Sequence, residues 1–366
     1  MSTERNKVDE LPRTANKGEW AELYVFFKIA LDKILYAADK DLKPKPDEYY
    51  EFIKLFRRNN VRGELIYDLS DGTRVQVYEN DQPVTIIDKQ TLGEKTQRIF
   101  DRIKTASSTF SVEEAVSLMD TYQLTSVKSP SASKADIEAL VKTTDSPTLH
   151  RTGFSIKSYI GNPPTLVNSS FHTNFIYEVT GFTGDIDEVN KIATRSKVRD
   201  RIASIRDSGG KLVFIGMQSD IYKNNLRMQD SNYPAVMARM LQYFYEGNGY
   251  ELDVLGKIVA TDDDIDMSAE EICYKTKSFL RSSALGMVPA SVWDTRLTTQ
   301  GGFIVLLESG ELVCYSLYYD DDFRDYLYAS TRFDTPSTTK YDYGYLYEEN
   351  GRLFIKLNLQ VRFKKV

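Results

Sequence analysis

The chain has 366 residues, of which 41% are hydrophobic and 27% charged, so it can form one large or two ordinary domains and is not a disordered polymer. No apolar run approaches the roughly 20 residues of a membrane span, and the polar start MSTERNKVDELPRT predicts no secretory signal. The net charge of −6, from 47 basic and 53 acidic residues, leaves a nucleic-acid partner open if the basic residues cluster.

Cysteine and histidine are scarce. Cys273 and Cys314 lie far apart without CxxC spacing, which excludes a disulfide framework and a thiolate zinc site and favours a reducing, cytoplasmic location. His150 and His172 are the only histidines, which argues against His-rich metal centres and most Ser-His-Asp arrangements. Any metal is therefore expected to be a hard cation with oxygen ligands.

The first part of the chain predicts a helical and hairpin lobe. Trp20, Leu23 and Phe27 recur at helical spacing and predict an amphipathic helix over 17–34. Ser111, with Glu114 three residues later, resembles a capping box. The other elements expected here are a helix near 47–59, strands at 63–68, 73–79 and 84–88, and helices at 92–105 and 111–122.

A second region is expected after the linker Ser129-Pro130-Ser131. Its first strands are predicted at Asp136–Lys142 and Phe154–Ile160, joined by a turn-rich connection. Further strands are predicted at 174–180, 211–217, 302–307, 311–318, 344–348 and 352–363, and helices at 185–206, 234–246 and 268–280. The pattern predicts an α/β or α+β fold, with a mixed sheet within residues 136–217, and two parts, 1–130 and 131–366.

One group of residues predicts chemistry. Ser155 and Lys157 lie two apart, so they share one face of a strand, and a neighbouring strand brings Asp136 opposite that face. An aspartate that binds Mg²⁺ and a lysine beside the attacking water are what metal-assisted phosphodiester hydrolysis needs. This pattern alone is weak, because such a spacing also arises from an unrelated surface Asp and Lys.

Three longer segments are more specific. NKGEWAELYVFFKIALDKILYAAD, GFSIKSYIGNPPTLVNSSFHTNFIY and the C-terminal FRDYLYASTRFDTPSTTKYDYG with IKLNLQVRF closely resemble the HpaII-like type II restriction endonucleases, in the same order. The resemblance implies a PD-(D/E)XK nuclease core with a central mixed β-sheet flanked by helices. It would occupy 131–366 together with strand-rich, C-terminal DNA-recognition elements, while 1–130 forms an N-terminal helix and accessory lobe. It also implies Mg²⁺ and cleavage of double-stranded DNA, with CCGG as the usual target.

The same resemblance assigns roles to residues. Asp136 matches the metal-binding aspartate and Lys157 the catalytic lysine, with Asp145 a less favoured alternative to Asp136. Ser155 stands where the general motif has Asp or Glu, so another carboxylate is needed for the metal. The predicted helix offers Glu19 and Glu22, and Glu19 is preferred because the preceding glycine allows close approach to DNA.

Further residues are expected to contact DNA. The segment from Lys191 to Lys211 holds seven basic side chains, these two lysines included. Arg195, Arg199 and Arg206 fall near one helical face that either contacts phosphates or is simply solvated. The run 168–174 either holds a loop or reaches DNA, and His172 in it is expected to be a structural, hydrogen-bonded residue. The candidates outside the basic helix are Asn168, Thr173, Asn174, Arg324, Arg332, Ser337, Thr338 and Lys340.

The prediction is thus a site-specific, Mg²⁺-dependent endodeoxyribonuclease that leaves 5′-phosphates. It is expected to act as a dimer on DNA, or as two monomers in turn, beside a companion DNA methyltransferase. Two alternatives remain open: a structure-specific repair nuclease of the same fold, and a DNA-binding protein that has lost metal binding. Mg²⁺-dependent nicking of a plasmid distinguishes the second alternative from the nucleases.

Overall fold

The computed structural model describes residues 14–59, 63–106, 109–124, 127, 135–144, 146–296 and 301–365. Contacts within these ranges divide the chain into two compact units. The first unit comprises Met1–Pro163 and Thr298–Asp320, and the second comprises Pro164–Leu297 and Asp321–Val366. The chain therefore passes from the first unit to the second after Pro163, and not near residue 130, where the sequence predicted the division.

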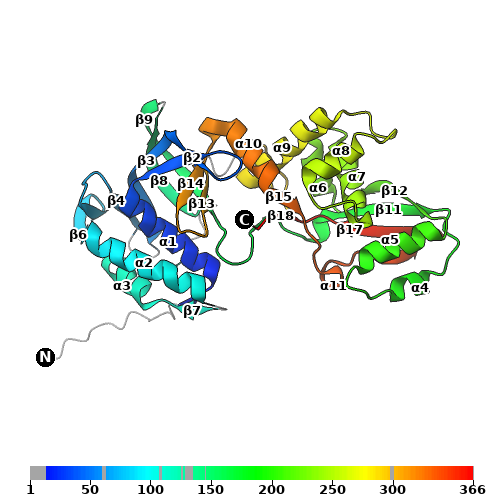
Figure 1. Cartoon of the computed structure of the whole chain (residues 1–366), viewed down its shortest axis with the longest axis horizontal. Helices are drawn as coiled ribbons and strands as arrows, with labels where there is room; N and C mark the ends of the chain where they lie inside the picture. The colour runs from blue at the N-terminus through cyan, green and yellow to red at the C-terminus, as the bar shows by residue number, and fades with distance from the viewer. Residues whose placement is uncertain are drawn as a thin grey trace. The chain divides into compact units, whose positions relative to one another are not determined.

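The described part of the first unit holds one nine-stranded sheet, coloured from blue to green with an orange insertion in Figure 1. Its strands are β2 (Ile34–Ala38), β3 (Pro44–Asn59), β4 (Gly63–Asp68), β5 (Arg74–Glu79), β6 (Gln82–Asp88), β8 (Ile137–Thr143), β9 (Ser146–Ser158), β13 (Gly302–Leu306) and β14 (Leu312–Tyr315).

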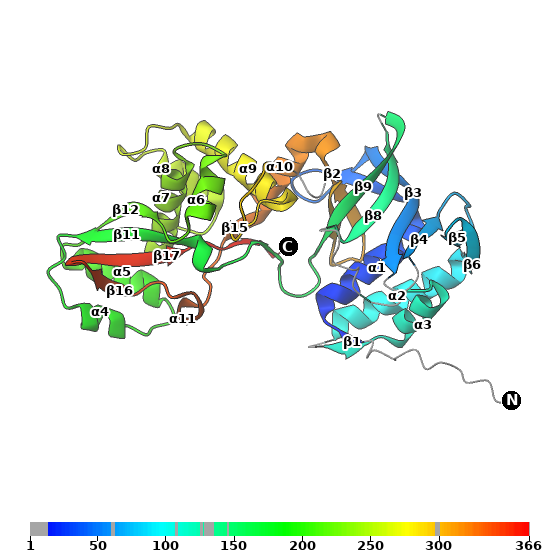
Figure 2. The same ribbon diagram turned by 180° about the vertical axis from the view of Figure 1, so that it is seen from behind.

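The order of these strands is β2-β14-β13-β9-β8-β3-β4-β5-β6, and β2 also pairs with β3. The strands from β2 through β14, β13, β9 and β8 to β3 therefore close on themselves as a barrel, and β4, β5 and β6 extend from it. Figure 2 shows β9, β8 and β3 side by side, as their antiparallel pairing requires. β13 comes from far along the chain and pairs in parallel with β9.

Three helices complete the core of this unit: α1 (Lys17–Asp32), α2 (Lys89–Thr105) and α3 (Glu113–Thr121). The predicted first helix is confirmed, and it is buried around most of its circumference, including Trp20, Phe26 and Phe27. The capping box expected at Ser111 is wrong, since the N-cap of α3 is Val112 without a side-chain bond. The short strands β1 (Thr14–Ala15) and β7 (Phe110–Ser111) pair with each other.

The helix expected over 47–59 is wrong, because this segment lies within β3. The strand carries a bulge between Phe52 and Lys54 in its pairing with β8. Tyr50, Phe52 and Leu55 are all buried, so the bulge changes the spacing of buried residues from two to three. A spacing of three between buried residues is also typical of a helical face, so the sequence pattern indicates a helix. The segment is a strand because it pairs with β2, β4 and β8.

In the described part of the second unit there are two smaller sheets, in the orders β12-β11-β17-β16 and β10-β18-β15. The strands are β10 (Thr165–Val167), β11 (Asn174–Thr180), β12 (Lys211–Met217), β15 (Thr331–Phe333), β16 (Leu346–Glu349), β17 (Arg352–Asn358) and β18 (Val361–Phe363). The helices are α4 (Ile186–Lys191), α5 (Lys197–Asp207), α6 (Asp220–Arg227), α7 (Tyr233–Glu246), α8 (Leu252–Val259), α9 (Ala269–Leu285), α10 (Asp320–Ser330) and α11 (Thr338–Tyr341), with a short 3-10 turn at Phe171–Thr173. A second 3-10 turn, Leu317–Tyr319, belongs to the first unit and directly precedes α10.

Several sequence expectations are corrected here. The single helix expected over 185–206 is two helices, α4 and α5, separated by 192–196. The strand expected over 352–363 is β17 and β18 in different sheets. The mixed sheet expected over 136–217 does not form, since β8 and β9 belong to the first unit and β11 and β12 to the second. The mixed α/β class is confirmed.

Two further expectations concern cysteines and membranes. Cys273 and Cys314 are both free thiols, and Cys314 is buried. No described helix is both long and apolar enough to cross a bilayer.

Candidate active site

Lys157 is the centre of the candidate site, and it lies on β9 near the end of that strand. Its β13 neighbour in the register is Val305, and its ammonium lies 4.8 Å from the centre of the Phe303 ring. Burial lowers the pKa of this lysine, while the negative charges of Asp136 and Glu22 oppose that shift. An ammonium that is desolvated in this way and feels the charge of carboxylates from two other segments is a candidate for proton exchange or charge stabilisation.

Asp136 lies directly before β8 and is fastened to the backbone of β9. Its Oδ2 accepts a hydrogen bond of 2.7 Å from the Ile156 N–H, and its own N–H donates to the Phe154 carbonyl at 2.9 Å. The Asp136 side chain thus extends the hydrogen bonding between β8 and β9 by one bond. That bond comes from Ile156, the residue that precedes Lys157. The structure therefore brings Asp136 and Lys157 together, as the sequence predicted.

A glycine permits this approach. A Cβ built on Gly153 of β9 would lie 2.6 Å from the Cβ of Ala135, the residue before Asp136. Real Cβ atoms do not approach one another so closely, so any other residue at 153 would displace the segment that carries Asp136. No local pattern in the sequence indicates this requirement.

The two glutamates of α1 have different environments. Glu19 closes a capping box: its Oε2 accepts from the Asn16 N–H at 2.9 Å, and its own N–H donates to the Asn16 Oδ1 at 3.0 Å. Glu22 is half-buried one turn later, and its charge acts on both Lys157 and Arg57. Of these two glutamates, Glu22 is therefore the one whose charge acts on Lys157, and Glu19 has a helix-capping role.

Arg57 was missed by the reasoning from sequence. It lies on β3, is 7% exposed, and donates from Nη2 to the Val127 carbonyl at 2.7 Å. Its guanidinium lies 5.5 Å from the centre of the Phe26 ring on α1. Burial lowers the pKa of Arg57, and Tyr67 and Glu22 raise it. The sequence pattern predicts a helix at this position, so nothing in it indicates that Arg57 is buried in a strand next to the site.

Ser155 is half-buried on β9 and pairs in register with Phe303. It adds a neutral hydroxyl and no charge, so the carboxylates of this site come from Asp136 and Glu22. Asp145, the alternative to Asp136, lies outside the described residues.

The donor atoms at this site suit Mg²⁺. Among the residues that the structure describes, no group of three or more His, Cys, Asp or Glu side chains could hold a metal. Mg²⁺ does not require such a group, because it is usually bound by one or two carboxylates and completes its octahedron with water and substrate phosphates. Asp136 and Glu22, whose charges both act on Lys157, offer hard oxygen ligands of the kind that Mg²⁺ prefers.

The residues expected to bind DNA all lie in the second unit. Thr173 and Asn174 are fully buried, and Asn174 Nδ2 donates to the Tyr341 carbonyl at 2.9 Å while its Oδ1 accepts from Asn358 Nδ2 at 2.7 Å. For these two residues the structure favours holding the loop over reaching DNA. Thr338 is 4% exposed, so its hydroxyl is likewise inaccessible in this structure.

Other candidates stay accessible. Asn168, Arg195, Arg199, Ser337 and Lys340 are exposed, and Arg195, Arg199, Ser337 and Thr338 line one cleft. Arg324, Arg332 and Lys340 lie over the rings of Tyr274, Tyr250 and Tyr341 at 6.0, 5.2 and 5.1 Å.

His172 is hydrogen-bonded, as expected of a structural residue. Its Nδ1 lies 2.8 Å from the Oγ of Ser219, the N-cap residue of α6.

Comparison with known proteins identifies the family of the chain. The model of the HpaII restriction endonuclease family matches residues 16–363. The type II restriction enzyme HpaII of Haemophilus parainfluenzae is 32% identical over 360 residues, which cover 96% of this chain and 98% of that enzyme. No solved structure matches the chain significantly. On the family match and this identity, the chain belongs to the HpaII restriction endonuclease family.

Proposed function

We propose that this protein is a type II restriction endonuclease that hydrolyses phosphodiester bonds of double-stranded DNA at a short specific sequence with Mg²⁺. The observation that carries the proposal is the attachment of Asp136 beside Lys157: the Asp136 Oδ2 accepts from the N–H of Ile156, the residue before Lys157, at 2.7 Å. The negative charges of Asp136 and Glu22 both act on the desolvated Lys157 ammonium. Membership of a restriction endonuclease family supports DNA as the substrate.

The arrangement is consistent with a PD-(D/E)XK nuclease core. Asp136 precedes one strand, and Lys157 lies on the adjacent antiparallel strand, with the Asp136 carboxylate bonded between them. Ser155 occupies the position of the usual second acid. In our proposal Glu22 supplies that carboxylate from α1, and Glu19 contributes through the capping box that fixes the start of the helix.

The side chains divide the chemistry as follows. Asp136 and Glu22 would hold Mg²⁺, which when bound polarises the scissile phosphate and lowers the pKa of the attacking water. The Lys157 ammonium orients that water and offsets the negative charge that grows on the phosphate. Arg57 and Glu22 interact through their opposite charges, and the N–H of Ile156 fixes the Asp136 carboxylate.

The target sequence, the products and the partner of the enzyme are proposed from its resemblance to the family. We propose a CCGG-like target, products with 5′-phosphates, and a companion DNA methyltransferase that protects the host sequence. Because a palindromic target presents two equivalent bonds, cleavage of both strands needs a dimer on DNA or two successive monomer events.

Digestion of plasmid DNA with and without Mg²⁺, followed by run-off sequencing of the ends, tests this function. Discrete Mg²⁺-dependent cuts at one short sequence are expected. Cuts restricted to branched or damaged DNA would instead favour a structure-specific nuclease. DNA binding without any cleavage in Mg²⁺ or Mn²⁺ would contradict the enzymatic assignment.

A further inference from the structure

We infer that a cleft in the second unit binds the phosphate backbone of duplex DNA, with Arg195, Lys197 and Arg199 as its cationic side chains. The inference rests on the proposed function, because it names the surface through which the nuclease would hold its substrate.

The cleft has a volume of about 700 Å³ and lies among three segments that are far apart in the sequence. They are 195–199 at the start of α5, 244–250 at the end of α7, and 335–339 at the start of α11. This space is much larger than a single phosphate ion, so the cleft suits an extended polyanion.

The charge of the cleft is positive. Arg195, Lys197 and Arg199 line it, and no Asp or Glu is among the lining residues in the described part of the chain. The nearest acid in sequence, Asp200, has an Oδ1 3.6 Å from the Arg199 Nε, but the Arg199 side chain is 57% exposed. An ion pair this exposed holds its arginine weakly, so Arg199 stays available to phosphates.

The other arginines of this basic run have structural partners. Arg201 is 2% exposed and donates to the carbonyls of Gly344, Asn190 and Ile192 at 2.6, 2.9 and 2.8 Å. It fastens α5 to the end of α4 and to the segment that precedes β16. The basic residues therefore separate into a buried anchor, Arg201, and the cleft-lining cations, of which Arg195 and Arg199 are exposed and Lys197 is half-buried.

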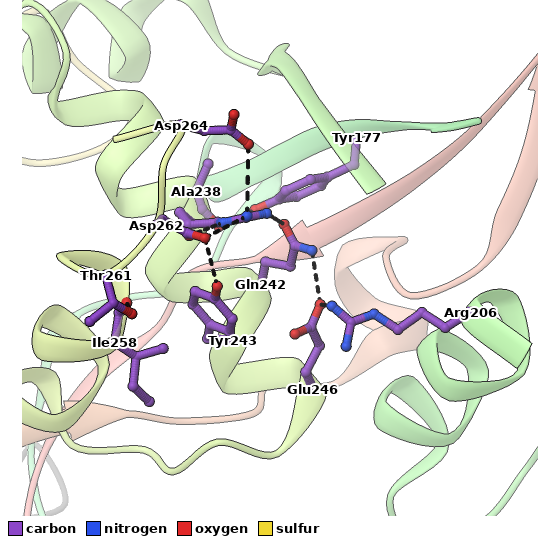
Figure 3. Close-up of polar contacts among 11 residues, drawn as sticks. Tyr177, Arg206, Ala238, Gln242, Tyr243, Glu246, Ile258, Thr261, Asp262 and Asp264 are labelled. Atoms are coloured by element: carbon purple, nitrogen blue, oxygen red, sulfur yellow. Dashed lines mark hydrogen bonds and ion pairs between the residues drawn. The ribbon is translucent and has the colours of Figure 1, made fainter. Parts of the chain in front are cut away.

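Arg206 joins the two helices that border the cleft. Its Nη2 lies 2.5 Å from the Oε1 of Glu246, whose side chain is 3% exposed at the end of α7 (Figure 3). The same Glu246 oxygen accepts from Gln242 at 2.8 Å, and Gln242 in turn accepts from Arg239. Arg239 is also paired with Asp262. Arg206, which the sequence placed among the phosphate contacts, thus belongs to the network that holds the cleft walls.

Glycines bring backbone close to the cations. Gly247 and Gly249 line the cleft with φ of 94° and 110°, in the left-handed region. A Cβ on Gly247 would lie 2.9 Å from the Arg199 Cδ, so the stem of Arg199 rests directly on this glycine. Exposed Ser196, Ser337 and Thr335 add hydroxyl groups on both walls. Guanidinium, ammonium and hydroxyl donors without carboxylates are the groups that contact DNA phosphates.

The test is a salt titration of DNA affinity with charge-matched variants. A fluorescent duplex that contains CCGG is titrated by fluorescence anisotropy in EDTA, so that no cleavage occurs. The cleft variant combines Arg195→Gln, Lys197→Gln and Arg199→Gln. The control combines Lys191→Gln, Lys211→Gln and Lys257→Gln, which removes the same charge from exposed residues of the second unit that do not line the cleft.

The cleft variant should lose at least about tenfold in affinity, and the slope of log affinity against log salt should fall by roughly 2 to 3, since each lost phosphate contact contributes about 0.9. The control should change neither quantity by as much, and both should melt like the wild type. Equal behaviour of the two variants would overturn the inference, while Mg²⁺-dependent cutting by the wild type would leave the proposed function intact. A wild type that neither binds nor cuts DNA would overturn both.

Discussion

The two units use basic side chains in opposite ways. In the first unit, Lys157 is partly withdrawn from water, its pKa is lowered by burial, and carboxylates face it. In the second unit, Arg195 and Arg199 are exposed on a cleft whose described lining contains no carboxylate. A lysine with a lowered pKa can exchange a proton or stabilise a developing negative charge, whereas an exposed arginine remains a permanent cation. The difference predicts chemistry in the first unit and substrate binding in the second.

The largest effect is expected from Asp136→Asn. The change keeps the shape of the side chain but removes the charge that would hold Mg²⁺, so cleavage should fall by at least about a thousandfold. Affinity for duplex DNA without metal should stay equal or rise, because a repulsion with phosphate is removed. Calorimetric titration of Mg²⁺ into the variant–DNA complex checks the cause. Undiminished Mg²⁺ binding would move the metal role away from Asp136.

The next effect distinguishes the two glutamates. Glu22→Gln should lower cleavage by at least about a hundredfold, because it removes a carboxylate that acts on Lys157. Glu19→Gln is the matched control from the same helix. Glutamine can still close the capping box with Asn16, so this variant should keep both cleavage and stability. The reverse pattern, with Glu19 essential and Glu22 dispensable, would contradict the assignment.

A smaller effect is expected at Gly153, which allows the segment of Asp136 to approach β9. Gly153→Ala places a Cβ against Ala135, and relieving that contact should cost about 1 to 3 kcal/mol of stability. Cleavage should fall roughly tenfold as Asp136 shifts. Gly72→Ala is the control, since nothing lies within 4 Å of a Cβ at Gly72. The rates are compared under single-turnover conditions, and equal rates for the two variants would exclude the positioning role.

The pH dependence of stability should also separate Lys157 from an ordinary lysine. Because its pKa is lowered in the folded state, the unfolded chain binds more protons between that pKa and the usual value of 10.5. Stability of the wild type relative to Lys157→Met should therefore rise as the pH increases toward 10.5. Urea denaturation of both proteins at pH 7 and pH 10 measures it, and a constant difference would contradict the desolvated ammonium.

Local patterns were enough to predict many elements. The helix α1 and the strands β11 and β12 follow from periodicity and turn residues, and Asp136, Lys157 and the pair of glutamates could be named from spacing and resemblance. The choice of Glu22 could not be made in this way, because it depends on which turn of α1 faces β9. The N-cap bond of Glu19 forms with the residue before the helix, and no periodicity reveals it.

Long-range pairing accounts for what was missed. β13 reaches β9 from about 150 residues away in the chain, and its Phe303 ring lies beside the Lys157 ammonium. The bulge in β3 gave a strand the spacing of a helix. In the second unit, the cleft combines three separate segments, so the sequence could indicate its arginines but not the residues that Arg201 and Arg206 hold in place.

The most direct test of this division of labour is Lys157→Ala, measured for both cleavage and binding. Single-turnover cleavage in Mg²⁺ should fall by at least about a hundredfold, because the ammonium acts on the water and on the charge of the transition state. Affinity for the duplex in EDTA should change by less than about threefold. Lys142→Ala is the control and should cut normally, since Lys142 is a half-exposed lysine paired with Glu51 on the neighbouring strand. Cleavage by Lys157→Ala at more than about a tenth of the wild-type rate would contradict the account.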